Sequence, residues 1–496
     1  MQLSQRWLHY YCFNELASTL LILWLVVAAA WPSETWPVAQ YLFHTAGDSD
    51  ARPTVTSRVL RCVGLYALAF STVALTMCAV LVLRRQCRTS RARARQLSKL
   101  SPRFPGRGRD SFREITVVAR DGLELLVRTT ATEDTFSTRQ PKKPIMLLCA
   151  GLGCSNADIL TPIMCHYGDA FTYVSWDYRG LFKSSHFTTS KRPLSIAEHA
   201  RDARDILQAL HGEGGVGGGR NPGDTIIVGH SMGSCVAFEF ALLFPAQVHS
   251  LIILNGFHGH IYSTGGQPIC RLPFAADFIS AAVELLLSHT AVLRCILWAL
   301  QPPFRAVVGL YGSMWQSPST QLVQSMGPTY LLDFVMNYFG DIMSSPRHAQ
   351  NWLTCIHELQ AFSCYHVLPR VSAPTLIISG FWDMITPPMQ SVEIARRVPG
   401  SLHYCDPFSS HVTMLESPEW CVAEIELFLL GLGVSGSDDN TVEKKCGKEE
   451  VKAKRRRAAI ITSKADAKKK KKQGTKSCSN DRKSRRRTRS APRRRK

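Results

Sequence analysis

Ser231 is the first residue of the chain whose type and surroundings predict chemistry. It stands in the pentapeptide Gly229-His-Ser-Met-Gly233, between a short apolar run and a stretch of helix-forming residues. This Gly-x-Ser-x-Gly pattern places a nucleophilic serine on a sharp turn from a strand into a helix. Small residues are needed two positions away on either side, because the strand and the helix approach each other closely there. The turn also places Ser231 at a helix N-terminus, which stabilises developing negative charge.

An acid and a base follow the serine at the ends of two further apolar segments. Asp383 follows the predicted strand 374–380, and His411 follows the predicted strand 402–408. Taken alone, either residue could be an ordinary loop aspartate or surface histidine. Together with Ser231 they supply what a serine hydroxyl needs, because an imidazole must take its proton and a carboxylate must fix the imidazole tautomer. We therefore expect Ser231 to attack, His411 to act as general base and then acid, and Asp383 to orient His411.

The order Ser, Asp, His is the order found in the α/β-hydrolase fold. Residues from about 112 to 431 resemble serine esterases and lipases of the α/β-hydrolase superfamily, of the monoacylglycerol-lipase type. The resemblance implies an α/β fold with a mostly parallel sheet and helices on both faces. The segment 147–155 resembles the family's oxyanion loop. By that resemblance, the backbone N–H groups of Leu152 and Met232 would bind the oxyanion.

A second loop resembles the family's Asp-x-Arg-Gly-x-Gly-x-Ser stretch and lies at residues 177–184. It departs from the pattern at Phe182, where the family usually has glycine. Because this loop borders the active site in the family, the departure leaves its local conformation open. We expect Asp177 and Arg179 to have structural roles.

The elements that must position these residues alternate between strands and helices. Asp121-Gly122 is a turn signal and predicts a hairpin between the first two strands. Strands are predicted at 112–119, 123–130, 145–150, 172–176, 225–228 and 250–255, and helices at 196–211 and 232–244.

The β/α alternation stops at residue 257 and resumes near 368. In this fold an insertion at that point is a helical cap over the active site, which would shape the substrate pocket. Its aromatic residues would suit an apolar acyl group, although each could equally belong to the cap's own core. They are Trp298, Phe304, Tyr311, Trp315, Tyr330, Phe334, Tyr338 and Phe339.

The basic character of the chain is confined to its flanks. The formal net charge is +21 over 496 residues. Residues 84–113 carry about 11 basic residues against 1 acidic residue, and residues 441–496 carry about 25 against 5. The remainder, mainly the hydrolase domain, has a net charge of about −9. The catalytic face is therefore not expected to be basic.

Two apolar segments near the N-terminus predict a membrane anchor over residues 1–83. Residues 16–31 would form a helix of about 24 Å and residues 63–83 one of about 31 Å, against a hydrocarbon core of about 30 Å. The first segment could instead be a cleaved signal peptide. Six arginines follow the second segment within residues 84–95, in a basic linker. The positive-inside rule then places the hydrolase domain and the tail in the cytosol. Endoplasmic reticulum and plasma membrane both fit.

The cysteines indicate neither a disulfide framework nor a metal site. All 16 lie scattered without a Cys-x-x-Cys pair or a zinc-ligand spacing, as expected of reduced thiols on the cytosolic side. The glycine-rich stretch 214–219 is not a phosphate loop, since no strand precedes it and no helix follows. We expect no cofactor and no metal, and the sequence gives no oligomeric state.

The tail 435–496 is predicted to be disordered, because its basic runs cannot bury a core. Three roles fit such a tail: attachment to an anionic membrane leaflet, nuclear import or nucleic-acid binding, and simple solubilisation. Its basic runs contain no aromatic residue on which a base could stack. Nucleic acid is therefore not the partner we expect.

Together these features predict a membrane-anchored serine hydrolase with its catalytic domain at 112–434. It would cleave carboxylic esters of hydrophobic or lipid substrates through an acyl-enzyme. A serine nucleophile argues against dehalogenase and epoxide-hydrolase chemistry, which uses an aspartate in this fold. Acyl transfer to another acceptor uses the same triad and stays open, as does a non-catalytic membrane scaffold. The sequence specifies neither the acyl length nor the head group.

Overall fold

The structure is a computed structural model. It describes residues 112–131, 143–154, 160–184, 194–210, 225–267, 270, 274–289, 291–293, 295–296, 345–407 and 409–434. The predicted spans at 16–31 and 63–83, the linker 84–111, the tail 435–496 and the aromatic middle of the insertion lie outside these residues. Among the helices that the structure describes, none is long and apolar enough to cross a membrane.

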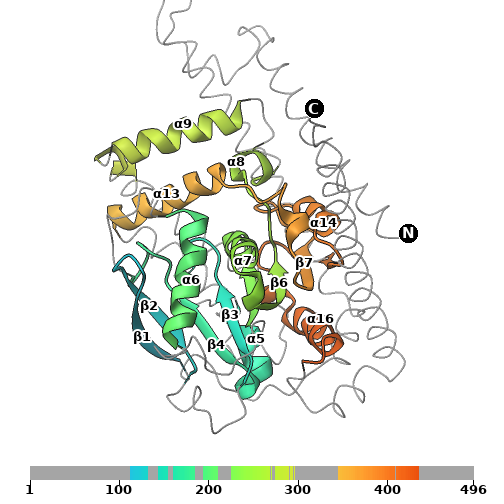
Figure 1. Cartoon of the computed structure of the whole chain (residues 1–496). Helices are drawn as coiled ribbons and strands as arrows, with labels where there is room; N and C mark the ends of the chain where they lie inside the picture. Colours follow the sequence, from blue (N-terminus) through green and yellow to red (C-terminus); the bar gives the residue numbers. More distant parts are fainter. Residues whose placement is uncertain are drawn as a thin grey trace, which may run out of the picture.

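An eight-stranded sheet forms the centre of the described domain (Figure 1), in the order β1-β2-β4-β3-β5-β6-β7-β8. The strands are β1 (Arg113–Val118), β2 (Glu124–Thr129), β3 (Ile145–Cys149), β4 (Thr172–Trp176), β5 (Thr225–His230), β6 (Val248–Leu254), β7 (Thr375–Gly380) and β8 (Leu402–Asp406). β1 and β2 form an antiparallel hairpin, and β2 pairs antiparallel with β4. The other pairs are parallel, so every strand except β2 runs in the same direction and seven strands deliver their carboxyl ends to one edge of the sheet.

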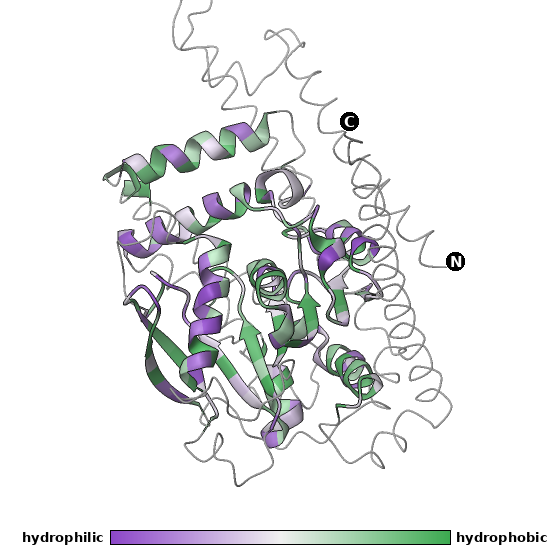
Figure 2. Ribbon diagram, viewed as in Figure 1, coloured by the Kyte–Doolittle hydropathy of each residue, from purple (hydrophilic) through white to green (hydrophobic). Residues whose placement is uncertain are grey.

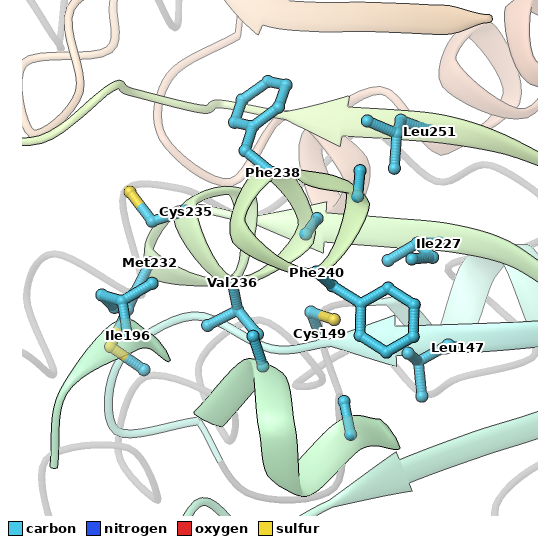
Figure 3. Close-up of a cluster of buried hydrophobic side chains, with 14 of the residues drawn as sticks. Leu147, Cys149, Ile196, Ile227, Met232, Cys235, Val236, Phe238, Phe240 and Leu251 are labelled. Atoms are coloured by element: carbon cyan, nitrogen blue, oxygen red, sulfur yellow. The ribbon is translucent and has the colours of Figure 1, made fainter. Parts of the chain in front are cut away.

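Helices cover both faces of the sheet because neighbouring strand residues point in opposite directions. Leu147 and Ile227 pack with α6 (Ile196–Leu210), α7 (Met232–Leu243) and α14 (Pro388–Arg397) on one face. On this face the ring of Phe240 in α7 lies beside Leu147 and Ile227 (Figure 3).

The opposite face is covered by two other helices. Met146 and Val228 pack there with α5 (Thr161–Tyr167) and α16 (Pro418–Gly431). Figure 2 shows hydrophobic residues along β3 and hydrophilic residues on the outward side of α6. The predicted α/β fold with a mostly parallel sheet and helices on both faces is therefore confirmed.

Three described helices lie in the insertion between β6 and β7. They are α8 (Ile261–Thr264), α9 (Ala275–Ser288) and α13 (Pro346–Ala361). Helices α9 and α13 contact each other, and both lie beyond the end of the sheet toward which β3 and β6 point (Figure 1). A helical insertion is therefore present where the alternation stops, and its action as a cap over the substrate stays a prediction.

Candidate active site

Ser231 occupies a sharp turn between the end of β5 and the start of α7. Its backbone has φ 52° and ψ −121°, a strained conformation for a residue with a side chain. The flanking glycines are sterically required. A Cβ on Gly233 would lie 2.0 Å from the carbonyl oxygen of Cys149, and one on Gly229 would lie 2.5 Å from the carbonyl oxygen of Gly233. The predicted sharp turn from strand to helix, called the elbow below (residues 229–233), is thus present at Ser231.

The structure brings Ser231, His411 and Asp383 into one hydrogen-bonded chain, although they are up to 180 residues apart. The Nε2 of His411 lies 3.1 Å from the Oγ of Ser231. Its Nδ1 lies 2.9 Å from the Oδ2 of Asp383. The imidazole is largely buried and the carboxylate fully so. This arrangement allows the imidazole to take a proton from the serine while the carboxylate balances the charge that forms.

The carboxylate of Asp383 is held by the loop that carries it. Its Oδ1 accepts hydrogen bonds from the backbone N–H groups of Ile385 at 2.9 Å and Thr386 at 2.8 Å. Its Oδ2 accepts a bond from Nδ2 of Asn255 at 2.9 Å. These contacts fix the orientation of the carboxylate beside His411.

Two residues of this site, Asn255 and Thr386, escaped the sequence analysis. Asn255 directly follows β6 with a left-handed backbone, φ 48°, and its Nδ2 also donates to the carbonyl oxygen of Ser410 at 2.9 Å. The hydroxyl of Thr386 contacts Asp383, Asn255 and His411. A signal for Asn255 was present, since a polar residue at the carboxyl end of a buried parallel strand faces the usual ligand edge of such a sheet.

Two buried acidic residues hold the loop that carries His411. Glu416 accepts hydrogen bonds from the backbone N–H and from the hydroxyl of Ser410, the latter at 2.7 Å. Asp406 accepts from the hydroxyls of Ser409 and Ser417, the latter at 2.7 Å. These bonds therefore fix Ser409 and Ser410, the two residues that precede His411.

His230, the residue before Ser231, also contacts the His411 loop. Its Nε2 lies 3.0 Å from the carbonyl oxygen of His411, and the two rings are 5.0 Å apart. Burial, together with the proximity of His411, lowers the pKa of His230 to about 3. His230 is therefore neutral near pH 7, and its Nε2–H can donate to the carbonyl group of His411.

The predicted oxyanion loop follows β3, next to the elbow. A Cβ on Gly151 would lie 3.4 Å from the Cβ of Ser231, so the loop adjoins the nucleophile. Leu152 follows Gly151 and is half-buried. Met232 is the buried first residue of α7, where a backbone N–H has no acceptor within the helix. Both residues predicted for the oxyanion hole therefore lie in segments that flank Ser231.

The part of the chain that holds Ser231, Asp383 and His411 is similar to known proteins. A model of the "Alpha/beta hydrolase family" matches residues 146–424, more than half of the 496 residues. The chain belongs to the alpha/beta hydrolase family. This confirms the resemblance inferred from the motifs and supports a hydrolase.

Individual relatives of this alpha/beta hydrolase are distant. "Putative carbamate hydrolase RutD" of Pseudomonas syringae is 24% identical over 283 residues, which cover 55% of this chain and 89% of that protein. Among solved structures, a hydrolase from Pseudomonas aeruginosa has 19% identity, covers 63% of this chain and 97% of its own, and has a TM-score of 0.41. A thermophilic esterase from Thermogutta terrifontis has 18% identity, coverages of 64% and 99%, and a TM-score of 0.43.

The loop 177–184 makes a sharp turn although it has Phe182 at the position where the family pattern has glycine. Phe182 has φ 50°, in the left-handed region that glycine favours. Its ring lies 6.1 Å from the ring of His348 in α13, and Nδ2 of Asn351 donates to the carbonyl oxygen of Gly180 at 2.6 Å. Contacts with the insertion therefore hold this turn in place.

The charged residues of the same loop form buried ion pairs. Nη1 of Arg128 lies 2.7 Å from Oδ1 of Asp177. The guanidinium group of Arg179 is fully buried, with Asp202 and Asp121 as its partners. These contacts agree with the structural roles expected for Asp177 and Arg179. No group of three or more His, Cys, Asp or Glu residues within the described part of the chain is placed to hold a metal ion.

Proposed function

We propose that the protein is a serine hydrolase that cleaves carboxylic esters of hydrophobic or lipid substrates through an acyl-enzyme. The observation that carries this proposal is the chain of contacts from Ser231 through His411 to Asp383, with distances of 3.1 and 2.9 Å. The strained turn at Ser231 and the buried, multiply bonded Asp383 support it.

The reaction begins when Nε2 of His411 takes the proton of the Ser231 hydroxyl as the oxygen attacks the ester carbonyl carbon. The resulting oxyanion would be bound by the backbone N–H groups of Leu152 and Met232. Collapse of this intermediate breaks the bond to the alcohol oxygen, and His411 returns the proton to the leaving alcohol. Water then attacks the acyl-enzyme with His411 again as base, releasing the acid and restoring Ser231.

The hydrophobic substrate class is supported by features outside the described residues. The apolar segments 16–31 and 63–83 would hold the enzyme at a membrane as two spans, with the hydrolase domain in the cytosol and the basic tail at the anionic lipid surface. The aromatic residues of the insertion would line a site for an acyl chain.

A carbamate is the second candidate substrate, because a relative at 24% identity carries the name carbamate hydrolase. The same serine chemistry would act on either carbonyl group. Transfer of the acyl group to an acceptor other than water would also use these residues, and analysis of the products separates it from hydrolysis.

Labelling with a fluorophosphonate probe tests the assignment of the nucleophile. We expect the wild-type full-length protein to be labelled and Ser231→Ala to be inert, while the exposed α9 serine variant Ser288→Ala is labelled like wild type. Turnover of matched aliphatic esters and carbamates then ranks the two substrate classes. Absence of labelling in folded wild-type protein would contradict the proposal and favour a non-catalytic scaffold.

The proposed topology has a separate test. Protease added to intact microsomes should remove the tail 435–496, which a C-terminal tag would report. Protection of that tag in sealed vesicles would exclude the cytosolic assignment without affecting the assignment of Ser231.

A further inference from the structure

The hydroxyl of Thr386 contacts three other residues of the candidate site. Its Oγ1 lies 2.7 Å from the carbonyl oxygen of Asn255, 2.8 Å from Oδ2 of Asp383 and 3.1 Å from Nδ1 of His411. The side chain is fully buried, so that water does not compete for these contacts. A hydroxyl has one proton to donate and two lone pairs with which to accept, so it cannot donate to every neighbour. Which neighbour accepts the proton depends on which acceptors lack another donor.

The carboxylate of Asp383 is already supplied with donors. Its Oδ1 accepts from the backbone N–H groups of Ile385 and Thr386, at 2.9 and 2.8 Å. Its Oδ2 lies 2.9 Å from Nδ2 of Asn255 and 2.9 Å from Nδ1 of His411. A carboxylate has about four lone-pair sites, so these four donors leave little need for a fifth. Nδ1 of His411 also lies 3.1 Å from Oδ1, so its proton is shared between the two carboxylate oxygens.

The carbonyl oxygen of Asn255 has the greater need of the hydroxyl proton. Among the hydrogen bonds of the described residues, the hydroxyl of Thr386 is the donor that reaches it. The side-chain Oδ1 of Asn255 is itself buried, and the described residues provide no partner for it. A second unsatisfied acceptor on this residue would be costly, because a buried polar group without a hydrogen bond loses its solvation without compensation. The proton of Thr386 can serve the carbonyl oxygen of Asn255 at 2.7 Å or Oδ2 of Asp383 at 2.8 Å, and with either acceptor the hydroxyl oxygen keeps its lone pairs.

Donation to either acceptor leaves the lone pairs of the Thr386 oxygen available to His411. To act as a base toward Ser231, a neutral imidazole must have its Nε2 unprotonated and its proton on Nδ1. We propose that Thr386 is a positioning residue whose hydroxyl oxygen accepts a second, shared hydrogen bond from the Nδ1–H of His411. This inference rests on the proposed function, since it concerns the base in that reaction.

The shared bond would have two effects on the reaction. It would fix the tautomer and the plane of the imidazole ring, with Asp383 and Thr386 as joint acceptors. It would also stabilise the imidazolium more than the neutral ring, because hydrogen bonds to charged groups are stronger than those between neutral groups. Thr386 would thus make His411 a stronger base than Asp383 alone would.

The other titratable groups near His411 remain in place when the hydroxyl is removed. Asp383 comes from the loop after β7 and His230 from the end of β5, and the pKa of His230, about 3, keeps it neutral near pH 7. Glu416 in α15 (Thr413–Glu416) and Asp406 at the end of β8 bond to serines of the His411 loop, and these bonds do not involve the Thr386 hydroxyl. A change in the pH profile of a Thr386 variant would therefore report on the hydroxyl.

The test measures the rate of fluorophosphonate labelling of the full-length protein as a function of pH. Thr386→Val removes the hydroxyl at nearly constant volume. We expect its plateau rate to fall about three- to tenfold and the midpoint of its acid limb to move about half a pH unit lower. Thr386→Ser keeps the hydroxyl and should restore both quantities. Thr386→Ala removes the hydroxyl with less risk of a steric clash, and should repeat the effect if the valine variant does not fold.

Thr375→Val is the matched control. Thr375 is buried at the other end of β7, and its hydroxyl donates to the carbonyl oxygen of Ala373 at 3.0 Å. We expect its substitution to lower stability without moving the pH midpoint. A midpoint that is unchanged in both Thr386→Val and Thr386→Ala, or that moves to higher pH, overturns the inference while leaving the proposed function intact. Wild-type protein that is not labelled at any pH overturns the proposed function and the inference with it.

Discussion

The Nε2 of His230 lies 3.0 Å from the carbonyl oxygen of His411, so the residue before Ser231 is bound to the backbone of His411. His230 is buried at the end of β5, and its contact joins the elbow directly to the loop after β8. The side chain of His230 and the main chain of His411 make this hydrogen bond. It therefore couples the position of Ser231, the neighbour of His230, to that of His411.

Loss of this contact should impair catalysis more than substrate binding. We expect His230→Leu to lower kcat about tenfold with little change in KM, because a net hydrogen bond contributes roughly 1 kcal/mol and the base is less well placed without it. His230→Gln keeps an N–H donor and should recover part of the loss. Steady-state kinetics on an aliphatic ester checks this, and a His230→Leu enzyme with wild-type kcat would contradict the coupling.

Substitution of an elbow glycine should destabilise the protein more than substitution of a glycine in an open turn. In Gly233→Ala the new Cβ would lie 2.0 Å from the carbonyl oxygen of Cys149, so strand and helix must separate. We expect a loss of about 3 kcal/mol in the free energy of unfolding, together with loss of probe labelling. Gly122 serves as the comparison, because its φ is +81° but a Cβ there would meet nothing within 4 Å.

Denaturant unfolding of both variants checks the contrast. Gly122→Ala should lose only about 1 kcal/mol, from backbone strain in the β1–β2 turn, and should keep its labelling. Equal losses in Gly122→Ala and Gly233→Ala would show that steric contact is not what Gly233 avoids.

Substitution of Phe182 should show how much the strained backbone at this position lowers the free energy of unfolding. Its φ of 50° is strained for any residue with a Cβ. Phe182→Ala and Phe182→Gly both lose the ring that packs near His348, but only glycine relieves the strain. We expect the glycine variant to be the more stable of the two by about 1 kcal/mol, measured by thermal or denaturant unfolding. An alanine variant equal to or more stable than the glycine variant would mean that the turn relaxes when the ring is removed.

The sequence was sufficient to predict the elements with strong local patterns. The buried strand β4 lies at the predicted residues 172–176, and the turn at Asp121-Gly122 joins β1 to β2 as expected. Ser231 could be found because the steric requirements of the elbow are written within five neighbouring residues. Asp383 and His411 could be found because each follows a short apolar strand.

Contacts between distant segments left no comparable local pattern. Thr386 bonds to a carbonyl oxygen 131 residues away, and no periodicity in the sequence indicates this. The short helix α5 was not predicted, because its seven residues start at Thr161-Pro162 and show little amphipathic repeat. Helix α14 was also missed, because it begins at Pro388 directly after Pro387 and a pair of prolines is a common loop signal, although proline is well tolerated in the first turn of a helix.

A buried histidine away from the site should make stability depend on pH. Burial, and then the positive charge of Arg179, lower the pKa of His199 to about 3 from an ordinary value of 6.5. Between these two values the unfolded chain binds a proton that the folded protein does not. Stability from this group is therefore complete above about pH 6.5 and falls as the pH drops toward 3, by on the order of 1 kcal/mol per pH unit.

Replacement of His199 by phenylalanine should flatten this dependence. The ring of His199 lies 4.7 Å from the ring of Tyr178, and phenylalanine can fill the same space without a titratable group. The readout is the slope of the unfolding free energy against pH below 6.5, which reports how many protons the chain takes up on unfolding. In His199→Phe this uptake should be smaller by about one proton. The slope is a better measure than the absolute stability, which also includes the packing of the ring against Tyr178. An unchanged slope would mean that His199 binds its proton equally well in the folded and unfolded chain.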